Sequence, residues 1–260
     1  MRRVTIRFLN IGLIVTLLAL AASVACAASF PTVYPVVKTQ GVRIDQAEGW
    51  PKEIQHGQGI QITHGQLEAE DIGVLRAMKI RYHLYLDDQK IIPSLIGAPI
   101  LSVEARNATE LESGAFSSCT SLEKIALPKV TKVGSYAFAR CESLKLAVLQ
   151  SAVEVGDNAF ENCHDAELIM LPKAERVGDN AFGFCHDLEY VMLPSLKRIG
   201  ANPFMDCRDL KVLVLGESPP GFHPRSFERA ARDGLTLIVP DASKYGALPE
   251  NMPQMTQVYE

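Results

Sequence analysis

The 260-residue sequence lacks the features that several large classes of protein require. It has no excess of basic residues, since 26 Lys and Arg stand against 30 Asp and Glu, so a nucleic-acid-binding surface is not expected. Gly and Pro are ordinary in number, at 18 and 15, and 47% of the chain is hydrophobic. This composition excludes a disordered, collagen-like or multi-span membrane chain and is typical of a folded protein of one or two domains.

Catalytic and metal-binding motifs are also missing. The sequence contains no G-x-S-x-G, no H-E-x-x-H and no glycine-rich phosphate loop. The six histidines are scattered without an obvious Ser or Cys partner, and the paired C-x₂₋₄-C spacing that zinc favours is absent. We therefore expect no enzyme, no cofactor and no bound metal ion.

The first segment has the order of a secretory signal. Basic residues come first, an apolar run follows at 11–22, and small residues come next; the basic residues are Arg2, Arg3 and Arg7. A membrane anchor is the alternative, although the run is short of the ~20 residues that a helical span needs. Removal of these arginines leaves 23 Lys and Arg against 30 Asp and Glu, a formal charge of −7.

Two cleavage chemistries fit the end of this segment. Ala25-Cys26-Ala27 matches the A-x-A pattern, so cleavage after Ala27 would make 1–27 a signal peptide. Acylation of Cys26 would instead give a lipoprotein, but Ser23 stands where such signals usually carry Leu, Val or Ile. Either route exports the chain to the periplasm, the outer-membrane surface or the extracellular space.

A 22-residue repeat occupies the middle of the chain. Five phenylalanines recur at this interval and a cysteine stands three residues after each, giving Phe116/Cys119, Phe138/Cys141, Phe160/Cys163, Phe182/Cys185 and Phe204/Cys207. A representative unit is GDNAFENCHDAELIMLPKAERV, and degenerate units flank the series. Each unit is too small to fold alone, so the units are expected to stack with parallel strands about 4.8 Å apart.

The pattern inside the unit predicts one short strand and one turn. Residues six and eight after each Cys alternate as a strand does and should face the core: Ile125/Leu127, Ala147/Leu149, Ile169/Leu171, Val191/Leu193 and Leu213/Leu215. A returning segment is then anchored by Val133, Val155, Val177 and Ile199. The next residue is expected to permit a tight turn, at Gly134, Gly156, Gly178 and Gly200. Asp-Asn in GDNAF is expected to cap a single helical turn.

The unit G-x-x-A-F-x-x-C-x-x-L-x-x-I-x-L-P resembles the repeat of the bacterial BspA-like leucine-rich repeat proteins. The segment 61–78 is similar to the strand and helix cap of related secreted proteins from Bacteroidetes, and 219–245 resembles their closing segment. The resemblance implies an α/β repeat solenoid, a right-handed coil with a parallel β-sheet on one face, short helical turns on the other and an N-terminal α/β cap. The predicted parts are the signal peptide 1–27, the cap 30–95, the repeats 96–216 and a terminal repeat with C-terminal cap 217–260.

The open edge of the first repeat needs a cover in this arrangement. Trp50, the only tryptophan, is expected to seal it together with Ile72, Leu75 and Met78.

Stacking should bring the five cysteines into one column. Neighbouring Cα atoms about 4.8 Å apart would permit disulfides, but parallel Cβ atoms at the same distance exceed the ~3.8 Å mean of a bridge. We expect buried, reduced thiols that fill space, with disulfide pairing as the alternative. This structural column consists of Cys119, Cys141, Cys163, Cys185 and Cys207.

Two polar columns accompany the cysteines. His164-Asp165, His186-Asp187 and Arg208-Asp209 suggest calcium binding or acid–base chemistry, but calcium needs six or more converging oxygens. A solvated turn, in which neighbouring groups relieve the carboxylate repulsion, is the favoured interpretation. Asn158, Asn180 and Asn202 are expected to cap turns or to form ladders of hydrogen bonds.

The outward positions of the strands are the best candidate site. Residues five and seven after each Cys should point away from the core. Four consecutive strands carry apolar residues there: Leu146, Val148, Leu168, Met170, Tyr190, Met192, Val212 and Val214. Monomers rarely expose a contiguous apolar patch of this size. Recognition or self-association is favoured, and strand propensity or coverage by a terminal segment is the alternative.

These features predict a non-catalytic secreted or surface-attached protein that recognises a protein ligand through the outward strand face. The resemblance implies adhesion to host or neighbouring-cell components. The alternative is a periplasmic assembly module that homodimerises or docks a partner of its own cell. Membrane contact is expected only through a lipid anchor at Cys26.

Overall fold

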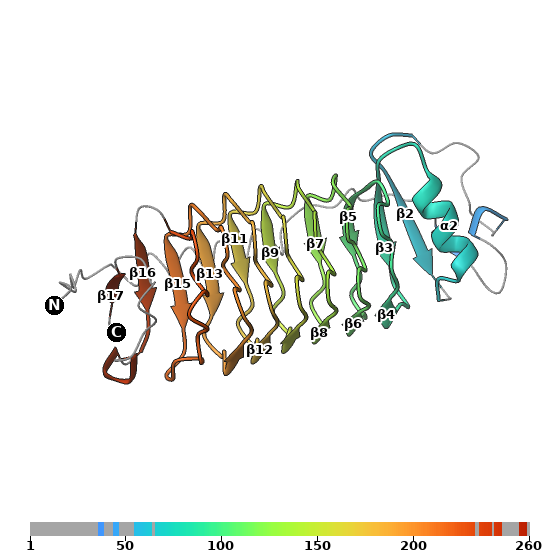
Figure 1. Ribbon diagram of the computed structural model, residues 1–260. Helices are drawn as coiled ribbons and strands as arrows, with labels where there is room; N and C mark the ends of the chain where they lie inside the picture. The colour runs from blue at the N-terminus through green and yellow to red at the C-terminus, as the bar shows by residue number, and fades with distance from the viewer. Residues whose placement is uncertain are drawn as a thin grey trace.

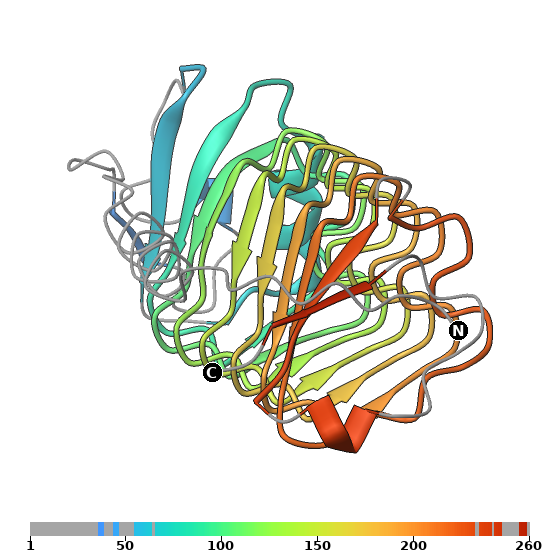
Figure 2. The ribbon, with the colours of Figure 1, turned by 90° about the vertical axis from the view of Figure 1, so that its left-hand side faces the viewer.

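The computed structural model describes residues 36–38, 44–46, 55–63, 66–231, 234–240, 242–245 and 255–258. The predicted signal segment with Cys26, and also Trp50, lie outside these residues. Successive coils stack along one axis, and Figure 2, viewed from the end that carries β17, shows how closely they superimpose. The predicted leucine-rich-repeat solenoid is confirmed.

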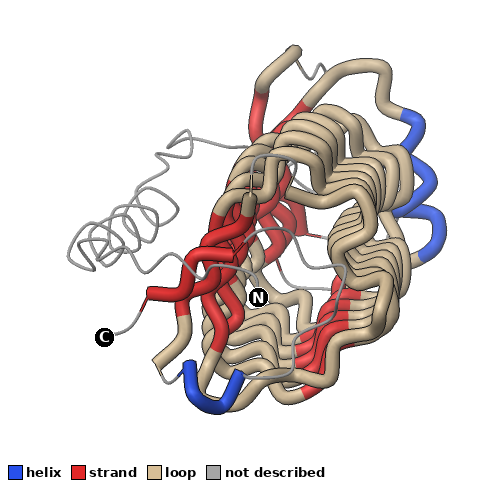
Figure 3. The backbone as a smooth tube through the Cα atoms, turned by 60° about the vertical axis from the view of Figure 1, so that its left-hand side comes forward, coloured by secondary structure: helices blue, strands red, loops and turns tan. Residues whose placement is uncertain are grey.

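The described strands lie in three parallel sheets. Sheet A contains β1 (Val36–Lys38), β2 (Gln58–Thr63), β3 (Tyr82–Leu86), β5 (Ile100–Glu104) and β7 (Lys124–Ala126). Sheet C contains β9 (Leu146–Val148), β11 (Leu168–Met170), β13 (Tyr190–Leu193), β15 (Val212–Leu215), β16 (Leu235–Ile238) and β17 (Met255–Val258). Sheet B contains β4 (Ile91–Ile92), β6 (Glu110–Leu111), β8 (Lys132–Val133), β10 (Glu154–Val155), β12 (Arg176–Val177) and β14 (Arg198–Ile199). Sheets A and C follow one another along one side of the solenoid, and sheet B forms another side (Figures 1 and 3).

The core follows the predicted alternation. All ten residues at positions six and eight after a Cys are buried. Equivalent residues of neighbouring repeats pair directly, as Ile169 does with Val191 in the ladder between β11 and β13. The 22-residue period therefore sets both the strand register and the side that faces inward.

Sheet B was not predicted, because the returning segment was expected only to anchor the core. Val155 is buried as expected, but it also pairs with Val133 and Val177 in a parallel ladder. Strands of two residues carry too little alternation to be recognised in a sequence. They form because the main-chain groups of the returning segment find partners in the adjacent coils.

The phenylalanines stack through the whole core. Ring centroids along the series Phe116, Phe138, Phe160, Phe182 and Phe204 are separated by 5.6, 5.0, 5.9 and 5.5 Å. Phe227 of the terminal repeat joins the stack at 5.3 Å from Phe204. All six rings are buried, so the stack links the repeats from the first to the last.

The predicted helical turn around each phenylalanine is wrong. Among the described residues, helix occurs only outside the repeats, in η1 (Ile44–Gln46), α2 (Ala69–Ala77) and η2 (Ala242–Tyr245). In the repeat that contains Phe160, Asn158 and Asn162 have φ angles of 56° and 60° on either side of that residue. Such left-handed residues cannot continue a right-handed helix, so the segment forms tight turns instead.

The glycine column has a different role from the one predicted. Gly156 does not adopt a positive φ, but a Cβ at this position would lie 2.5 Å from the Ser135 nitrogen and 2.8 Å from the Gly134 carbonyl carbon. Gly134, Gly178 and Gly200 are equally close to the coil before them. The glycines therefore allow neighbouring backbones to approach.

Aspartate, and not the adjacent asparagine, makes the side-chain ladder. Asp157 Oδ1 accepts a hydrogen bond from the Asp179 N–H at 2.9 Å, and Asp179 Oδ1 accepts one from the Ala201 N–H at 2.7 Å. The asparagines instead occupy left-handed positions, which their short polar side chains tolerate.

The described part of the N-terminal region packs against the core of the repeats. Leu75 of helix α2 is buried, and Ile72 of the helix and Met78 directly after it pack against the core. Tyr82 donates a hydrogen bond to the Leu75 carbonyl at 3.0 Å. Leu95 takes the place of phenylalanine in the first turn, since its carbonyl accepts from the Cys119 thiol. The region predicted as a cap thus also supplies a coil of the solenoid.

Candidate functional site

A second hydrophobic cluster lies on the outer face of sheet C, separate from the core. Val148, Met170 and Met192 form its centre, at position seven after successive cysteines. Leu146, Leu168 and Val214 are partly buried and pack against this centre. We call these six residues the outer cluster. The parallel pairing of β9, β11, β13 and β15 places equivalent side chains next to one another and so makes the surface continuous.

The exposed part of this face is narrower than the sequence suggested. Val148, Met170 and Met192 are only 9%, 5% and 8% exposed. Tyr190 is 37% exposed and stands between Leu168 and Val212, both of which are half-buried. In strands β9 to β15, accessible apolar surface therefore lies mainly at position five, with Tyr190 as its most exposed large side chain.

The outer cluster begins where sheet C begins. In sheet A, β7 presents Lys124 at position five, and this lysine is exposed. The next strand, β9, presents Leu146 at the equivalent position. The change from a charged to an apolar outer face therefore occurs between two neighbouring repeats of the same geometry.

The five cysteines of the repeats are buried and are free thiols, so the alternative of disulfide pairing within the column does not hold. Each thiol lies within hydrogen-bonding distance of a carbonyl in the preceding coil, as for Cys163 Sγ and the Phe138 oxygen at 3.1 Å.

Cys185, like the other four cysteines, does more than fill space. Its Sγ lies 3.0 Å from the Phe160 oxygen of the preceding coil and 3.9 Å from the Gly183 oxygen of its own turn. The contact with the Phe160 carbonyl could not be predicted from the sequence, because the spacing of 25 residues between donor and acceptor is set by the stacking of coils and not by the unit itself. Cys185 therefore links two coils as well as filling the core, and it is not a binding residue.

Burial also governs the acidity of the thiols. It raises the pKa of the Cys119 thiol to about 12 and holds the pKa values of Cys141, Cys163 and Cys207 well above their ordinary value. These thiols stay protonated near neutral pH and offer no reactive thiolate. The column is therefore structural.

The histidine and aspartate columns do not converge into a site. The rings of His164 and His186 stack at 4.9 Å, while Asp165, Asp187 and Asp209 are exposed. Within the described ranges, no group of three or more His, Cys, Asp or Glu side chains is placed to hold a metal ion.

A buried carboxylate nearby escaped the sequence analysis. Asp206 is 4% exposed and accepts hydrogen bonds from Arg208 Nε and Nη2 at 2.9 and 2.8 Å. These hydrogen bonds, together with the charge of Arg208, lower the pKa of Asp206 despite its burial. Equivalent positions carry Arg140, Asn162 and Phe184, so no repeating residue type marked this place. The arrangement is a satisfied ion pair.

Comparison with known families decides what the repeats are. Residues 101–229 match the BspA type leucine rich repeat region in six copies. The repeats of this chain are BspA-type leucine-rich repeats. The matched segment coincides with the part of the solenoid in which phenylalanine, cysteine and strand residues recur.

Two solved structures resemble this BspA-type protein. A leucine-rich repeat protein from Bacteroides ovatus is 22% identical with a TM-score of 0.44; the match covers 61% of this chain but only 51% of that one, about half its length. A leucine rich cell surface protein from Faecalibacterium prausnitzii is 13% identical with a TM-score of 0.34, over 87% of this chain and 84% of that one. None of the curated proteins compared matches the sequence.

The BspA-type repeats leave the outer cluster as the main candidate for recognition. In the part of the chain that the structure describes, no helix is long and apolar enough to cross a membrane. The sequence contains no known catalytic motif, and the thiols and the buried carboxylate have structural partners.

Proposed function

We propose that this BspA-type protein is exported, has no catalytic activity, and binds a protein ligand on the outer face of sheet C. The observation that carries the proposal is the outer cluster, a second group of packed apolar side chains on the side of the sheet opposite the core. A soluble solenoid needs only one hydrophobic core. Apolar columns on the other side of the same strands therefore favour a role in contact with a partner.

Tyr190 is proposed as the anchor of this contact. Its ring stands in the exposed column between Leu168 and Val212, directly beside the outer cluster. Tyrosine combines a large apolar ring with a hydroxyl that can donate a hydrogen bond, and it is enriched at the centres of protein interfaces. A ligand that covers Tyr190 would extend the outer cluster into a continuous dry contact.

The signal-like first segment and the BspA-type repeat support action outside the cytoplasm. We propose adhesion to host or neighbouring-cell components as the function. The alternative is an assembly role within the cell envelope, in which the same face would contact a second copy of the chain or another protein of the same cell. The following experiment separates the two.

The exported chain would be immobilised and exposed in parallel to a panel of purified extracellular-matrix proteins and to envelope proteins of the producing cell. The variant Tyr190→Lys places a charge in the contact and is expected to abolish binding to the host panel. Tyr136→Lys is the matched control, because Tyr136 is 47% exposed and lies in a turn outside sheet C. Equal binding by the two variants would contradict the proposal.

Sedimentation velocity distinguishes the assembly role. If the chain forms a tight dimer that Tyr190→Lys dissociates, the face serves self-association. A monomer that binds a matrix protein through Tyr190 supports adhesion.

A further inference from the structure

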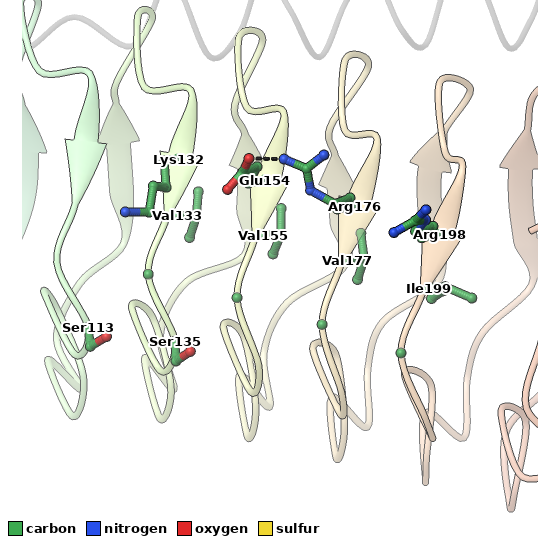
Figure 4. A pocket seen from close by; sticks show the side chains of 14 residues that line it. Ser113, Lys132, Val133, Ser135, Glu154, Val155, Arg176, Val177, Arg198 and Ile199 are labelled. Carbon is green, nitrogen blue, oxygen red and sulfur yellow. Dashed lines mark hydrogen bonds and ion pairs between the residues drawn. The ribbon is translucent and has the colours of Figure 1, made fainter.

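A shallow groove crosses the outer side of sheet B, away from the outer cluster. Its volume is about 490 Å³. The glycines 134, 156, 178 and 200 form part of its lining, and charged side chains at the preceding strand positions rise beside them (Figure 4). Its size is within the range of about 300–1,000 Å³ that is common for ligand sites.

The charges beside the groove form a column in register. Glu110, Lys132, Glu154, Arg176 and Arg198 occupy equivalent places in five neighbouring strands. Lys132 pairs with Glu110, and Arg176 pairs with Glu154. Each cation in these two pairs thus finds a carboxylate one repeat earlier.

Arg198 breaks this alternation. Its neighbour in the ladder is Arg176, which already pairs with Glu154, and Arg198 has no ion-pair partner among the described residues. Figure 4 shows both arginine side chains beside the groove, with a dashed line from Arg176 only. Among the residues that the structure describes, the groove therefore ends in a cation without an ion-pair partner.

The next repeat cannot complete the column. The positions 22 residues after Lys197 and Arg198 are Pro219 and Pro220, and β14 is the last strand of sheet B. Proline has no N–H to donate to a ladder, so the sheet ends here. Among the lining residues, Lys132, Arg176 and Arg198 stand against Glu154, a charge of +2 in a chain of formal charge −4.

We propose that this groove binds an extended acidic peptide segment, with a carboxylate held by Arg198. The planar guanidinium presents two parallel N–H groups that match a carboxylate, and Arg176 reinforces the positive potential one repeat away. The distance from Gly134 to Gly200 is three strand spacings, about 14 Å, which spans about four extended residues. None of the lining residues is aromatic, so the groove has no flat ring on which a sugar could stack and favours a peptide.

The like-charged neighbours also make a prediction about stability. Equal charges directly opposite one another in a ladder are unfavourable. Arg198→Glu would restore the alternation with Arg176 and should raise the melting temperature while it removes the carboxylate site. This proposal concerns a different sheet from the proposed adhesion face and does not depend on it.

The test uses the full exported chain at low salt and a hexaglutamate peptide with blocked ends, with binding measured by calorimetry. Arg198→Gln should weaken binding roughly tenfold or more, as expected for the loss of charge-assisted hydrogen bonds. Arg198→Glu should weaken peptide binding at least as much, and this variant should melt at a higher temperature than the parent. Arg81→Gln removes an exposed arginine from the N-terminal part, outside the groove, and should bind the peptide like the parent.

Several outcomes would overturn the proposal. No binding of hexaglutamate by the parent, or equal affinities for Arg198→Gln and Arg81→Gln, would remove Arg198 as the anchor. Tighter binding of trigalacturonate than of the peptide would assign the groove to an acidic glycan. A blocked hexaglutamine peptide that binds as well as hexaglutamate would show that carboxylates are not recognised.

Discussion

Sheets B and C are built from the same 22-residue unit, yet the surfaces that they present differ in chemical character. Sheet C has strands of three or four residues in its repeats and carries the apolar outer cluster. Sheet B has strands of two residues and carries a column of charges that pair between coils. The period fixes the spacing of both faces, and a few outward positions decide whether each surface is apolar or charged. Apolar side chains can repeat at about 4.8 Å without penalty, whereas equal charges at that spacing repel one another.

The largest effect should come from the phenylalanine stack that both faces share. Phe160→Ala removes the central ring, which lies 5.0 and 5.9 Å from its neighbours, and should cost about 3–5 kcal/mol in the free energy of unfolding. Phe222→Ala is the control, because Phe222 is only partly buried and contacts the stack at its end. Urea denaturation measures both, and similar losses would show that the stack is not the shared core.

The backbone approach beside sheet B gives the next effect. Gly156→Ala places a methyl group 2.5–2.9 Å from three backbone atoms of the preceding coil and should cost about 3 kcal/mol. Gly221→Ala meets no atom within 4 Å and should be nearly neutral. Equal melting temperatures for the two variants would contradict the close-approach role.

The thiol column should make the solenoid sensitive to alkali. Burial raises the pKa values of Cys119, Cys141, Cys163 and Cys207, so the unfolded chain releases these protons at a lower pH than the folded chain. The contribution of these protonated thiols to the free energy of unfolding is complete below about pH 8.5, the pKa of a cysteine in the unfolded chain. It is lost as the pH rises above that value, at up to about 1.4 kcal/mol per thiol and pH unit. Cys163→Ser keeps a donor for the Phe138 carbonyl and should flatten the fall measured by denaturation between about pH 8 and pH 10. If the stability of Cys163→Ser falls with pH as steeply as that of the parent, the buried thiol is not the cause of the alkaline sensitivity.

The sequence predicted the solenoid because Phe and Cys recur at a constant interval and the strand positions alternate around them. It could not give the role of Gly156, since a tight turn and a close backbone approach both require glycine, and only the neighbouring coil distinguishes them. Likewise, GDNAF could not show which of Asp157 and Asn158 makes the ladder, and the repeat could not show that the Cys185 thiol has the Phe160 carbonyl as its partner.

The candidate sites were predicted to different degrees. The apolar column was recognisable because four strands repeat it, but the alternation alone did not show that Met170 and Met192 are buried within it. The groove was missed because its charged residues precede valines that were interpreted only as anchors. Their alternation at intervals of 22, from Glu110 to Arg176, is the signal that would have found it.

A smaller effect is expected from the charge column. Glu154→Gln removes the partner of Arg176 and leaves three cations at this face, at a cost of about 0.2–1 kcal/mol because the pair is exposed. The loss should shrink when denaturation is repeated at about 1 M salt, where the screening length is about 3 Å. A loss independent of salt would mean that packing, and not charge, is the cause.

The central claim is that the exposed column of the outer face of sheet C, represented by Tyr190, does not hold the fold together and is therefore free to contact a partner. Within β13, Leu193 is buried in the core and Tyr190 is exposed on the outer side. The most direct measurement is the equilibrium free energy of unfolding of Leu193→Ala and Tyr190→Lys under identical conditions. The account predicts a loss of about 2–5 kcal/mol for Leu193→Ala and a change within about 0.5 kcal/mol for Tyr190→Lys. Equal losses would contradict it, because the outer face would then be part of what holds the fold together.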